Sequence, residues 1–249
     1  MTDHILVSRD GAVQTIRFNR PDKKNAITSA MYAQMAEALT VGEADDEIRC
    51  HVILGTPGAF TSGNDLQDFM AFAANGDMGK EVVDFLNAMA GLNKPFVSGV
   101  DGLAIGIGTT IHMHCDLTFA TPNSVFKTPF VDLGLVPEAG SSLLAPALMG
   151  HQRAYALLAM GETFSALQAV EAGLIYKIVE AEALEEVVAT TAANLASRAP
   201  TAMAHAKRLM KPELDSVKAR IAEEAKLFEA QLTSDEARAA FMAFMTRKK

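Results

Sequence analysis

Alternating apolar and polar positions open the chain. The stretch "HILVSRDGAVQTIRFNRP" has two β-rich runs around Asp10 and Gly11, which predicts a hairpin that ends at Pro21. Apolar residues then recur at helical spacing, and Thr28 is a suitable N-cap for that helix. The chain is therefore expected to begin with a hairpin and a helix.

Short apolar runs alternate with helical segments through the middle of the chain. "CHVILGT", "KPFVSGV" and "CDLTFAT" are bounded by turn residues, which is typical of buried strands. Residues 78–92 repeat apolar positions at helical spacing, with Val82, Phe85 and Met89 on one face. Strands that alternate with helices predict an α/β fold.

The pattern becomes helical after about Val179. Residues 184–195 and 221–232 each place apolar side chains on one helical face, and few strand signals remain. Such a tail is either an oligomerisation element or a helical layer that folds back on its own core. Both interpretations are compatible with the sequence.

Composition and charge narrow the class of protein. The 249 residues carry a net charge of −8, which argues against nucleic acid as the main partner. No apolar run reaches about 18 residues, so no membrane span is expected. The N-terminus "MTDHILVSRDG" lacks the layout of a signal peptide, and the end "TRKK" is no peroxisomal address. Cys50 and Cys115 form no short-spaced pair, so a cytoplasmic chain without disulfides is expected.

The segment "GLAIGIGTTIHMHCDL" has glycines before a possible buried helix. Gly106 and Gly108 would let backbone or ligand approach closely, and N–H groups at a helix start are unpaired. The dinucleotide fingerprint needs a third glycine, but position 111 is Ile111. A tight turn without a ligand is the alternative. His112 and His114 are two positions apart and face different sides of a helix, so buried side chains are favoured over metal ligands.

Two polar segments carry further candidates. "GAFTSGNDL" lacks the second glycine that a nucleophilic Ser62 would need, and Asp65 is expected to be an N-cap or a loop-bracing carboxylate. "NRPDKKNAI" places Lys23 and Lys24 in a loop that suits phosphates, although a solvated turn is the simpler interpretation.

Glu138 is the single charged residue of "LGLVPEAGSSLLAPALMG". An acid before a helix is favoured by the helix dipole. The apolar surroundings equally suit a catalytic base, whose pKa rises when it is buried. Phe130 and Leu135 favour a raised pKa, whereas a helix that begins near Ser141 favours a lowered one.

Taken in order, four segments resemble the crotonase superfamily, the enoyl-CoA hydratases and isomerases. They are "NRPDKKNAI", "GAFTSGNDL", "KPFVSGVDGLAIGIGTTIHMHCDLTFAT" and "FKTPFVDLGLVPEAGSSLLAPALMG", and the resemblance extends over about residues 5–180. It implies a spiral of β-β-α units with a C-terminal helical oligomerisation region. We accordingly expect a core at 1–190 for acyl-CoA binding and catalysis, and a helical region at 191–249 that builds a homotrimer or hexamer.

The resemblance also implies a site. Backbone N–H groups of Ser62 and Ile107 would hold the thioester oxygen of an acyl-CoA substrate. Thr110 and Phe130 stand where hydratases of the family carry their two glutamates. Glu138 matches the single catalytic glutamate of the Δ3,Δ2-enoyl-CoA isomerase branch.

The expected activity is therefore the shift of a 3-enoyl-CoA double bond to 2-trans-enoyl-CoA, as in fatty-acid β-oxidation. A 2-enoyl-CoA hydratase or another crotonase-type lyase or hydrolase is the alternative, and a non-catalytic acyl-CoA-binding protein is a second one. No metal and no cofactor beyond the CoA moiety of the substrate is expected. Weaker assignments by resemblance are CoA contacts at Phe244 and Lys248 in the tail. The CoA and substrate contacts implied by the resemblance are Lys23, Lys24, Ala26, Ser62, Gly63, Asn64, Asp65, Leu66, Gly106 and Phe130.

Overall fold

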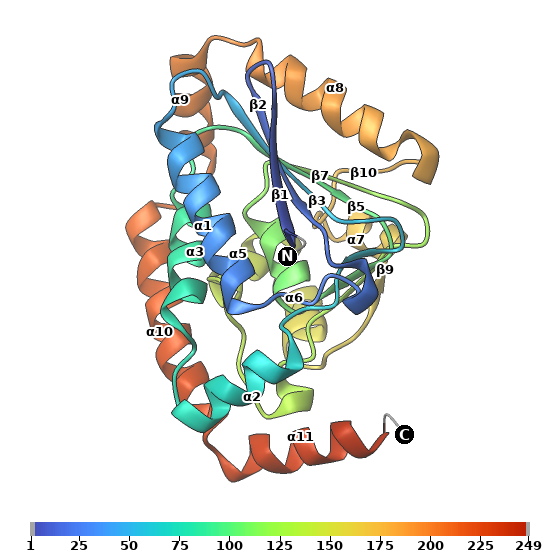
Figure 1. Ribbon diagram of the computed structural model, residues 1–249, viewed down its shortest axis with the longest axis vertical. Coiled ribbons are helices and arrows are strands. Elements are labelled where there is room, and N and C mark those ends of the chain that lie inside the picture. The colour runs from blue at the N-terminus through green and yellow to red at the C-terminus, as the bar shows by residue number, and fades with distance from the viewer. Residues whose placement is uncertain (1–2, 248–249) are drawn as a thin grey trace.

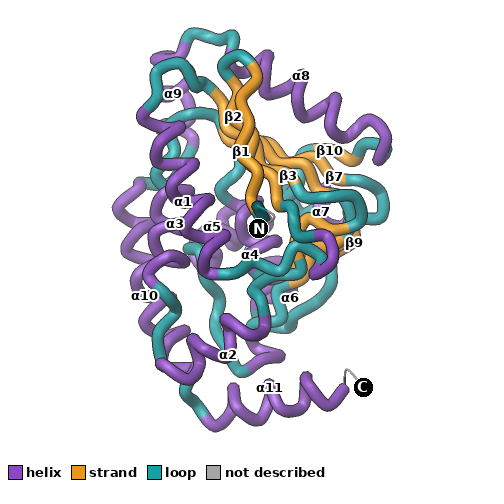
Figure 2. The backbone as a smooth tube through the Cα atoms, viewed as in Figure 1, coloured by secondary structure: helices purple, strands orange, loops and turns teal. Residues whose placement is uncertain are grey.

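Two β-sheets form the centre of the fold (Figure 2). The computed structural model describes residues 3–247, without the side chains of residues 73–75, 244, 245 and 247. The first sheet has six strands in the order β1 (Ile5–Asp10), β2 (Val13–Phe18), β3 (Cys50–Leu54), β5 (Phe96–Val100), β7 (Leu117–Ala120) and β10 (Lys177–Ile178). The second sheet has four strands in the order β4 (Ala59–Thr61), β6 (Leu103–Ile105), β8 (Val125–Lys127) and β9 (Phe164–Ser165).

Successive strand pairs build both sheets at once. β3, β5 and β7 lie side by side and parallel in the six-stranded sheet. The strands that follow them, β4, β6 and β8, lie parallel in the four-stranded sheet. Each pair is followed by helical structure, so the chain advances as a spiral of β-β-α units. The expected α/β class is confirmed.

Helices cover the sheets on several sides. The stack of α1, α3 and α10 lies on one side, and α8 crosses the outer face of the six-stranded sheet (Figure 1). The α-helices are α1 (Ser29–Ala44), α2 (Leu66–Asn75), α3 (Lys80–Ala90), α4 (Ile107–Thr110), α5 (Ser141–Met149), α6 (His151–Leu158), α7 (Ala166–Glu171), α8 (Leu184–Ala196), α9 (Pro200–Met210), α10 (Leu214–Leu232) and α11 (Asp235–Arg247). The 3-10 helices are η1 (Pro21–Lys23), η2 (Ile111–Met113), η3 (Val131–Leu133) and η4 (Ala181–Ala183).

Local sequence signals placed several elements correctly. β1 and β2 form the expected antiparallel hairpin across Asp10 and Gly11. The Thr28 side chain caps α1 by accepting from the Met31 N–H. The helix expected over residues 78–92 is α3, which buries Val82, Phe85 and Met89. The three apolar runs are β3, β5 and β7.

The short strands were missed. β4 lies inside the segment "GAFTSGNDL". β4, β6 and β8 have three residues each. A strand of three residues is too short to show a period of two in the sequence. Phe130 adopts a helical conformation at the start of η3.

The C-terminal helices pack on their own core. Val188 of α8 is buried in a second apolar cluster with Val52, Val97 and Phe119 of the sheet. The division between residues 190 and 191 therefore falls inside a helix that covers the core. α10 contacts α3 and α5, so this region is a helical layer folded back on the core, one of the two expected arrangements. Within residues 3–247, no helix is long and apolar enough to cross a membrane.

Candidate active site

Glu138 lies in the loop between η3 and α5, and its side chain is buried at 5% exposure. The Thr110 hydroxyl at the end of α4 donates to Glu138 Oε1 across 2.6 Å. Among the described residues, no protein group donates to Oε2 of this carboxyl.

Burial dominates the acidity of this group. It raises the pKa of Glu138 from 4.5 to about 8, the nearby charge of Glu224 acts in the same direction, and the Thr110 hydrogen bond opposes both. Burial is therefore the largest influence on the pKa of Glu138, and the pKa is raised rather than lowered. A carboxyl with this pKa exchanges a proton near neutral pH, as general acid–base catalysis requires.

The backbone after Glu138 is held in an unusual conformation. Ala139 has a φ of +62° and Gly140 one of +69°, in the left-handed region that a side chain disfavours. The His114 Nε2–H donates to the Ala139 carbonyl across 2.7 Å. The Glu224 carboxylate of α10 accepts from the N–H of Gly140. Two buried side chains thus fix the loop that carries Glu138.

Two glycine-containing segments meet at α4, the helix that carries Thr110. A Cβ atom on Gly108 would lie 2.5 Å from Thr61 Cγ2, and one on Gly63 would lie 3.0 Å from the Ile105 carbonyl oxygen. Glycine therefore lets the segment after β4 and the start of α4 touch. Ile107 is the first residue of α4, so its N–H has no acceptor within the helix.

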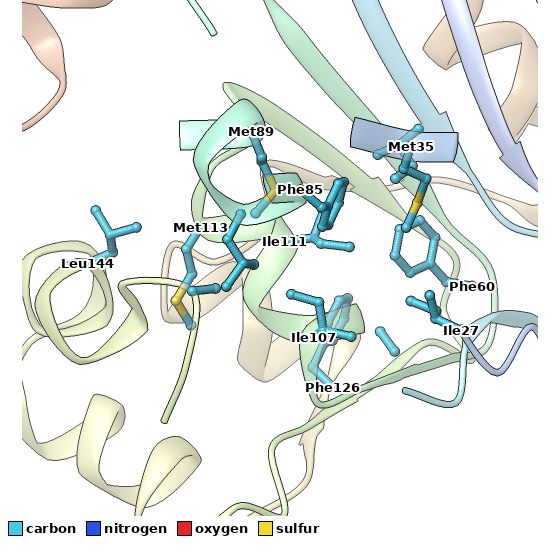
Figure 3. Packing of buried hydrophobic residues seen from close by; sticks show 14 of the residues in the cluster. Ile27, Met35, Phe60, Phe85, Met89, Ile107, Ile111, Met113, Phe126 and Leu144 are labelled. Atoms are coloured by element: carbon cyan, nitrogen blue, oxygen red, sulfur yellow. The ribbon is translucent and has the colours of Figure 1, made fainter. Parts of the chain in front are cut away.

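The Ile107 side chain is buried in the main core, in the cluster that also contains Ile111, Phe85 and Phe126 (Figure 3). The apolar neighbours expected for Glu138, Phe130 and Leu135, are buried in the same cluster. Ile111 and Ala139, the residues that follow Thr110 and Glu138, belong to this cluster too, so the Thr110–Glu138 pair lies at the apolar core.

The assignment of Ser62 as the second N–H donor is wrong. Its N–H donates to the Lys24 carbonyl across 2.9 Å, so it is not available to a ligand. The Ile27 N–H donates to the Gly63 carbonyl, and the Asp65 N–H donates to the Ile27 carbonyl. Because hydrogen-bonding groups alternate along such a bridge, the Asn64 N–H faces away from Ile27 and has no partner in the described chain.

The cationic loop lies against the same segment. Lys23 and Lys24 are exposed, and their carbonyl oxygens accept from the Ser62 hydroxyl and N–H. Ala26 is half-buried, and its carbonyl accepts from Arg20. The structure therefore brings the two predicted CoA-contacting segments together, with both lysine side chains accessible.

Asp65 has a structural role. It caps α2, which begins at Leu66, by accepting from the Gln67 N–H, as expected. Its other oxygen pairs with Arg20 at 2.6 Å, so this carboxylate and this cation neutralise each other. Gly106 precedes α4 with a φ of +59°, a conformation that favours glycine.

Tyr32 is a site residue that sequence reasoning missed. Its hydroxyl donates to Asn64 Oδ1, and burial together with the nearby Glu138 raises its pKa well above the usual value. The sequence offers one signal for it: Tyr32 places a polar hydroxyl among Met31 and Met35 on the buried face of α1. Lys248 and the side chain of Phe244 lie outside the described residues.

His112 and His114 are buried, as expected. His112 Nδ1 lies 3.0 Å from the Ser98 hydroxyl, and His114 bonds the Ala139 carbonyl. Burial lowers the pKa of His112 to about 3 and that of His114 to about 4, so both rings are neutral. Among the described residues, no cluster of three or more His, Cys, Asp or Glu side chains could hold a metal ion.

The β-β-α spiral, with a buried carboxyl in the loop before α5, is the architecture that the resemblance to the crotonase class implies. A family model described as enoyl-CoA hydratase/isomerase matches residues 8–249. The chain belongs to this family. It is 36% identical to enoyl-CoA delta isomerase 2 of Rattus norvegicus over 98% of this chain, and it spans 64% of that relative's length.

Other relatives support the same family and fold. The 1,2-epoxyphenylacetyl-CoA isomerase of Escherichia coli is 35% identical over 80% of this chain and 78% of its own length. The structure of OdaA from Pseudomonas aeruginosa is 41% identical, with a TM-score of 0.92, over 98% of this chain and 99% of that one. The expected crotonase fold is confirmed.

Proposed function

We propose that this chain shifts the double bond of a 3-enoyl-CoA to the 2-trans position, with Glu138 as the single base. The observation that carries this proposal is a buried carboxyl with a pKa near 8 that binds one protein hydroxyl and has a free oxygen. One such group suffices for a 1,3-proton transfer because the same carboxyl takes and returns the proton.

The proposed steps balance without a further reactant. The ionised Glu138 carboxylate removes a proton from C2, and the electron pair moves onto the thioester oxygen as a dienolate forms. The N–H groups of Asn64 and Ile107 stabilise that oxygen, which is worth several kcal/mol in related sites, about 3–4 per donor. Protonated Glu138 then delivers the proton to C4, and the conjugated 2-enoyl thioester results.

The alternative of hydration is less well supported. Thr110 and Phe130 occupy the positions of the two hydratase glutamates, and neither side chain accepts a proton from water at neutral pH. Phe130 is also buried among apolar residues, which does not favour a bound water. The similarity to the rat enoyl-CoA delta isomerase agrees with this preference.

Epoxide isomerisation is a second candidate. An epoxide opens when its oxygen receives a proton, and Glu138 with a pKa near 8 is mostly protonated at neutral pH. The similarity to the E. coli 1,2-epoxyphenylacetyl-CoA isomerase points to this chemistry. The two reactions need opposite states of Glu138, so the rate of epoxide opening should fall above pH 8 while the enoyl shift rises toward it.

Two further assignments accompany this function. We propose that the exposed Lys23 and Lys24 bind phosphate groups of CoA, because they adjoin the segment that presents the Asn64 N–H. We also propose a homotrimer, alone or paired into a hexamer, as the resemblance implies. Light scattering of the purified chain tests the second proposal.

The deciding experiment compares Glu138→Gln with Glu223→Gln, whose carboxylate is exposed on α10. Both variants and the wild type are assayed with 3-enoyl-CoA, 2-enoyl-CoA and an epoxyacyl-CoA, and CoA-ester binding is measured by calorimetry. We expect Glu138→Gln to lose isomerisation while binding survives, and Glu223→Gln to retain both. Unchanged turnover by Glu138→Gln would refute the assignment. Binding without exchange of the C2 proton in heavy water would indicate a non-catalytic protein.

A further inference from the structure

A second buried carboxylate lies at the start of α5. Glu224 of α10 is 4% exposed, and its two oxygens accept from the backbone N–H groups of Gly140, across 2.5 Å, and of Ser142, across 2.9 Å. These donors are more than 80 positions away along the chain. A carboxylate that binds two N–H groups at a helix N-terminus is stabilised as an anion.

The N–H groups of Gly140 and Ser142 lie two and four positions after Glu138 in the sequence. If they were free, the positive end of α5 would favour the ionised form of Glu138. Glu224 occupies them instead and adds its own negative charge beside Glu138. Two nearby buried carboxyls do not ionise together easily, so one of the pair retains a proton.

The surrounding groups decide which carboxyl is ionised. Arg220, also on α10, donates to the Ser142 hydroxyl across 3.2 Å and so places a cation on the Glu224 side. Tyr32 of α1 faces Glu138 as a neutral phenol, and His114 beyond η2 is a neutral ring. Burial raises the pKa of Glu224 above its usual value, but the hydrogen bonds from Ser142 and Gly140 and the charge of Arg220 oppose that rise, whereas only the Thr110 hydroxyl opposes it at Glu138.

We propose that Glu224 is a positioning residue for the reaction of Glu138: as the ionised partner it holds the α5 N-terminus, fixes the adjoining backbone and sets the pH at which Glu138 loses its proton. This inference rests on the proposed function, in which Glu138 is the base. Glutamine could not fully replace Glu224, because its amide has one acceptor oxygen for the two N–H groups.

The pH dependence of kcat/KM for 3-enoyl-CoA tests the proposal. Glu224→Gln is expected to move the acid limb to lower pH by roughly one unit, the size of effect that a neighbouring charge produces. Glu224→Asp, which keeps the charge, should restore much of the wild-type limb, and Glu186→Gln, at an exposed carboxylate of α8, should leave it in place. A Glu224→Gln enzyme that is slower but keeps the wild-type pH profile would show a structural role and overturn the proposal.

A readout without turnover separates this proposal from the proposed function. The infrared carbonyl band that disappears in Glu138→Gln reports protonated Glu138 in the free protein. Its titration should move to lower pH in Glu224→Gln, even if the wild type isomerises no enoyl-CoA at all. An unmoved titration would overturn the role of Glu224 and leave the isomerase assignment intact.

Wild-type protein provides the test if Glu224→Gln does not fold. The amide protons of Gly140 and Ser142 report the charge of Glu224 through their hydrogen bonds. They should keep their hydrogen-bonded chemical shifts while the Glu138 band titrates, and lose them in more acidic solution. Loss of these shifts in step with the Glu138 titration would show that Glu224 is not the permanently ionised partner.

Discussion

The Thr110 hydroxyl donates a 2.6 Å hydrogen bond to the buried carboxyl of Glu138. By its resemblance to the family, Thr110 stands where hydratases carry a glutamate, and here it is a hydrogen-bond donor to Glu138. This hydrogen bond favours the ionised form and opposes burial, which raises the pKa of Glu138. It therefore keeps the base within reach of neutral pH.

Thr110→Val should make Glu138 a base that ionises at higher pH. The side chain keeps its shape and loses its donor, and a hydrogen bond to a charged group is worth about 1.5–3 kcal/mol, or roughly one to two pH units. Since the reaction needs ionised Glu138, the acid limb of kcat/KM should move upward and the rate at pH 7 should fall by roughly ten- to a hundredfold. Thr110→Ser is the control that keeps the hydroxyl. A Thr110→Val limb at the wild-type pH would contradict the prediction.

Glu138 should also make the stability of the fold depend on pH. Its pKa is raised from 4.5 to about 8 in the folded chain, so the folded state binds this proton more tightly than the unfolded state. The resulting stability is fully present below pH 4.5 and is lost as the pH rises to about 8. Glu138→Gln, which cannot ionise, should therefore gain on the order of 4 kcal/mol over wild type between pH 4.5 and 9.

Urea unfolding of both proteins across this range measures the effect. Titrating groups far from Glu138 affect wild type and variant alike, so the difference between the two curves reports Glu138 together with its coupling to Glu224. A difference that does not change with pH would mean that the carboxyl has an ordinary pKa in the folded chain.

Local patterns predict most of the long elements of the fold, whereas the assignment of Glu138 as the base comes from the family resemblance. The hairpin, α1 and the long strands follow from periodicity and from the Thr28 cap, which are properties of neighbouring residues. The choice of Ser62 over Asn64 failed because it depends on which N–H groups Lys24 and Ile27 engage, more than 30 positions away. No local rule reveals such a contact.

For Glu224, the helical periodicity of α10 gives a partial signal of its burial. It lies on the face of α10 that also buries Ile221 and Phe228, three and four positions away. A charged residue on a buried helical face needs a partner, which the sequence can indicate. The partners themselves, Gly140 and Ser142, come from packing α10 onto α5.

Gly108→Ala should impair catalysis more than substrate binding. Its new Cβ would lie 2.5 Å from Thr61 Cγ2, and Thr61 is held by a hydrogen bond to the Asn25 carbonyl. The two N–H donors would then move apart, and loss of one such donor reduces kcat by about 10² to 10³. Steady-state kinetics with 3-enoyl-CoA and calorimetry with a non-reacting acyl-CoA measure the two effects. A kcat that stays at the wild-type value would show that these segments do not hold the thioester oxygen.

Gly134→Ala should loosen α11. Gly134 has a φ of +70°, and a Cβ there would lie 2.7 Å from the Ala237 nitrogen, a backbone atom of α11. Gly11 is the matched control, because its φ is +55° and a Cβ would meet nothing within 4 Å. Positive φ alone costs alanine about 1–2 kcal/mol, so Gly11→Ala should lose that much stability in urea unfolding.

Gly134→Ala should lose about 2–4 kcal/mol, because α11 must also move and Phe241 must leave its contact with Phe69, whose ring centroid is 4.9 Å away. Limited digestion with trypsin gives a local readout, since Arg238 on α11 is exposed but lies in a helix that must open before cleavage. Faster cleavage at Arg238 is expected in Gly134→Ala and not in Gly11→Ala. Equal stability and equal cleavage in the two variants would show that Gly134 does not set the position of α11.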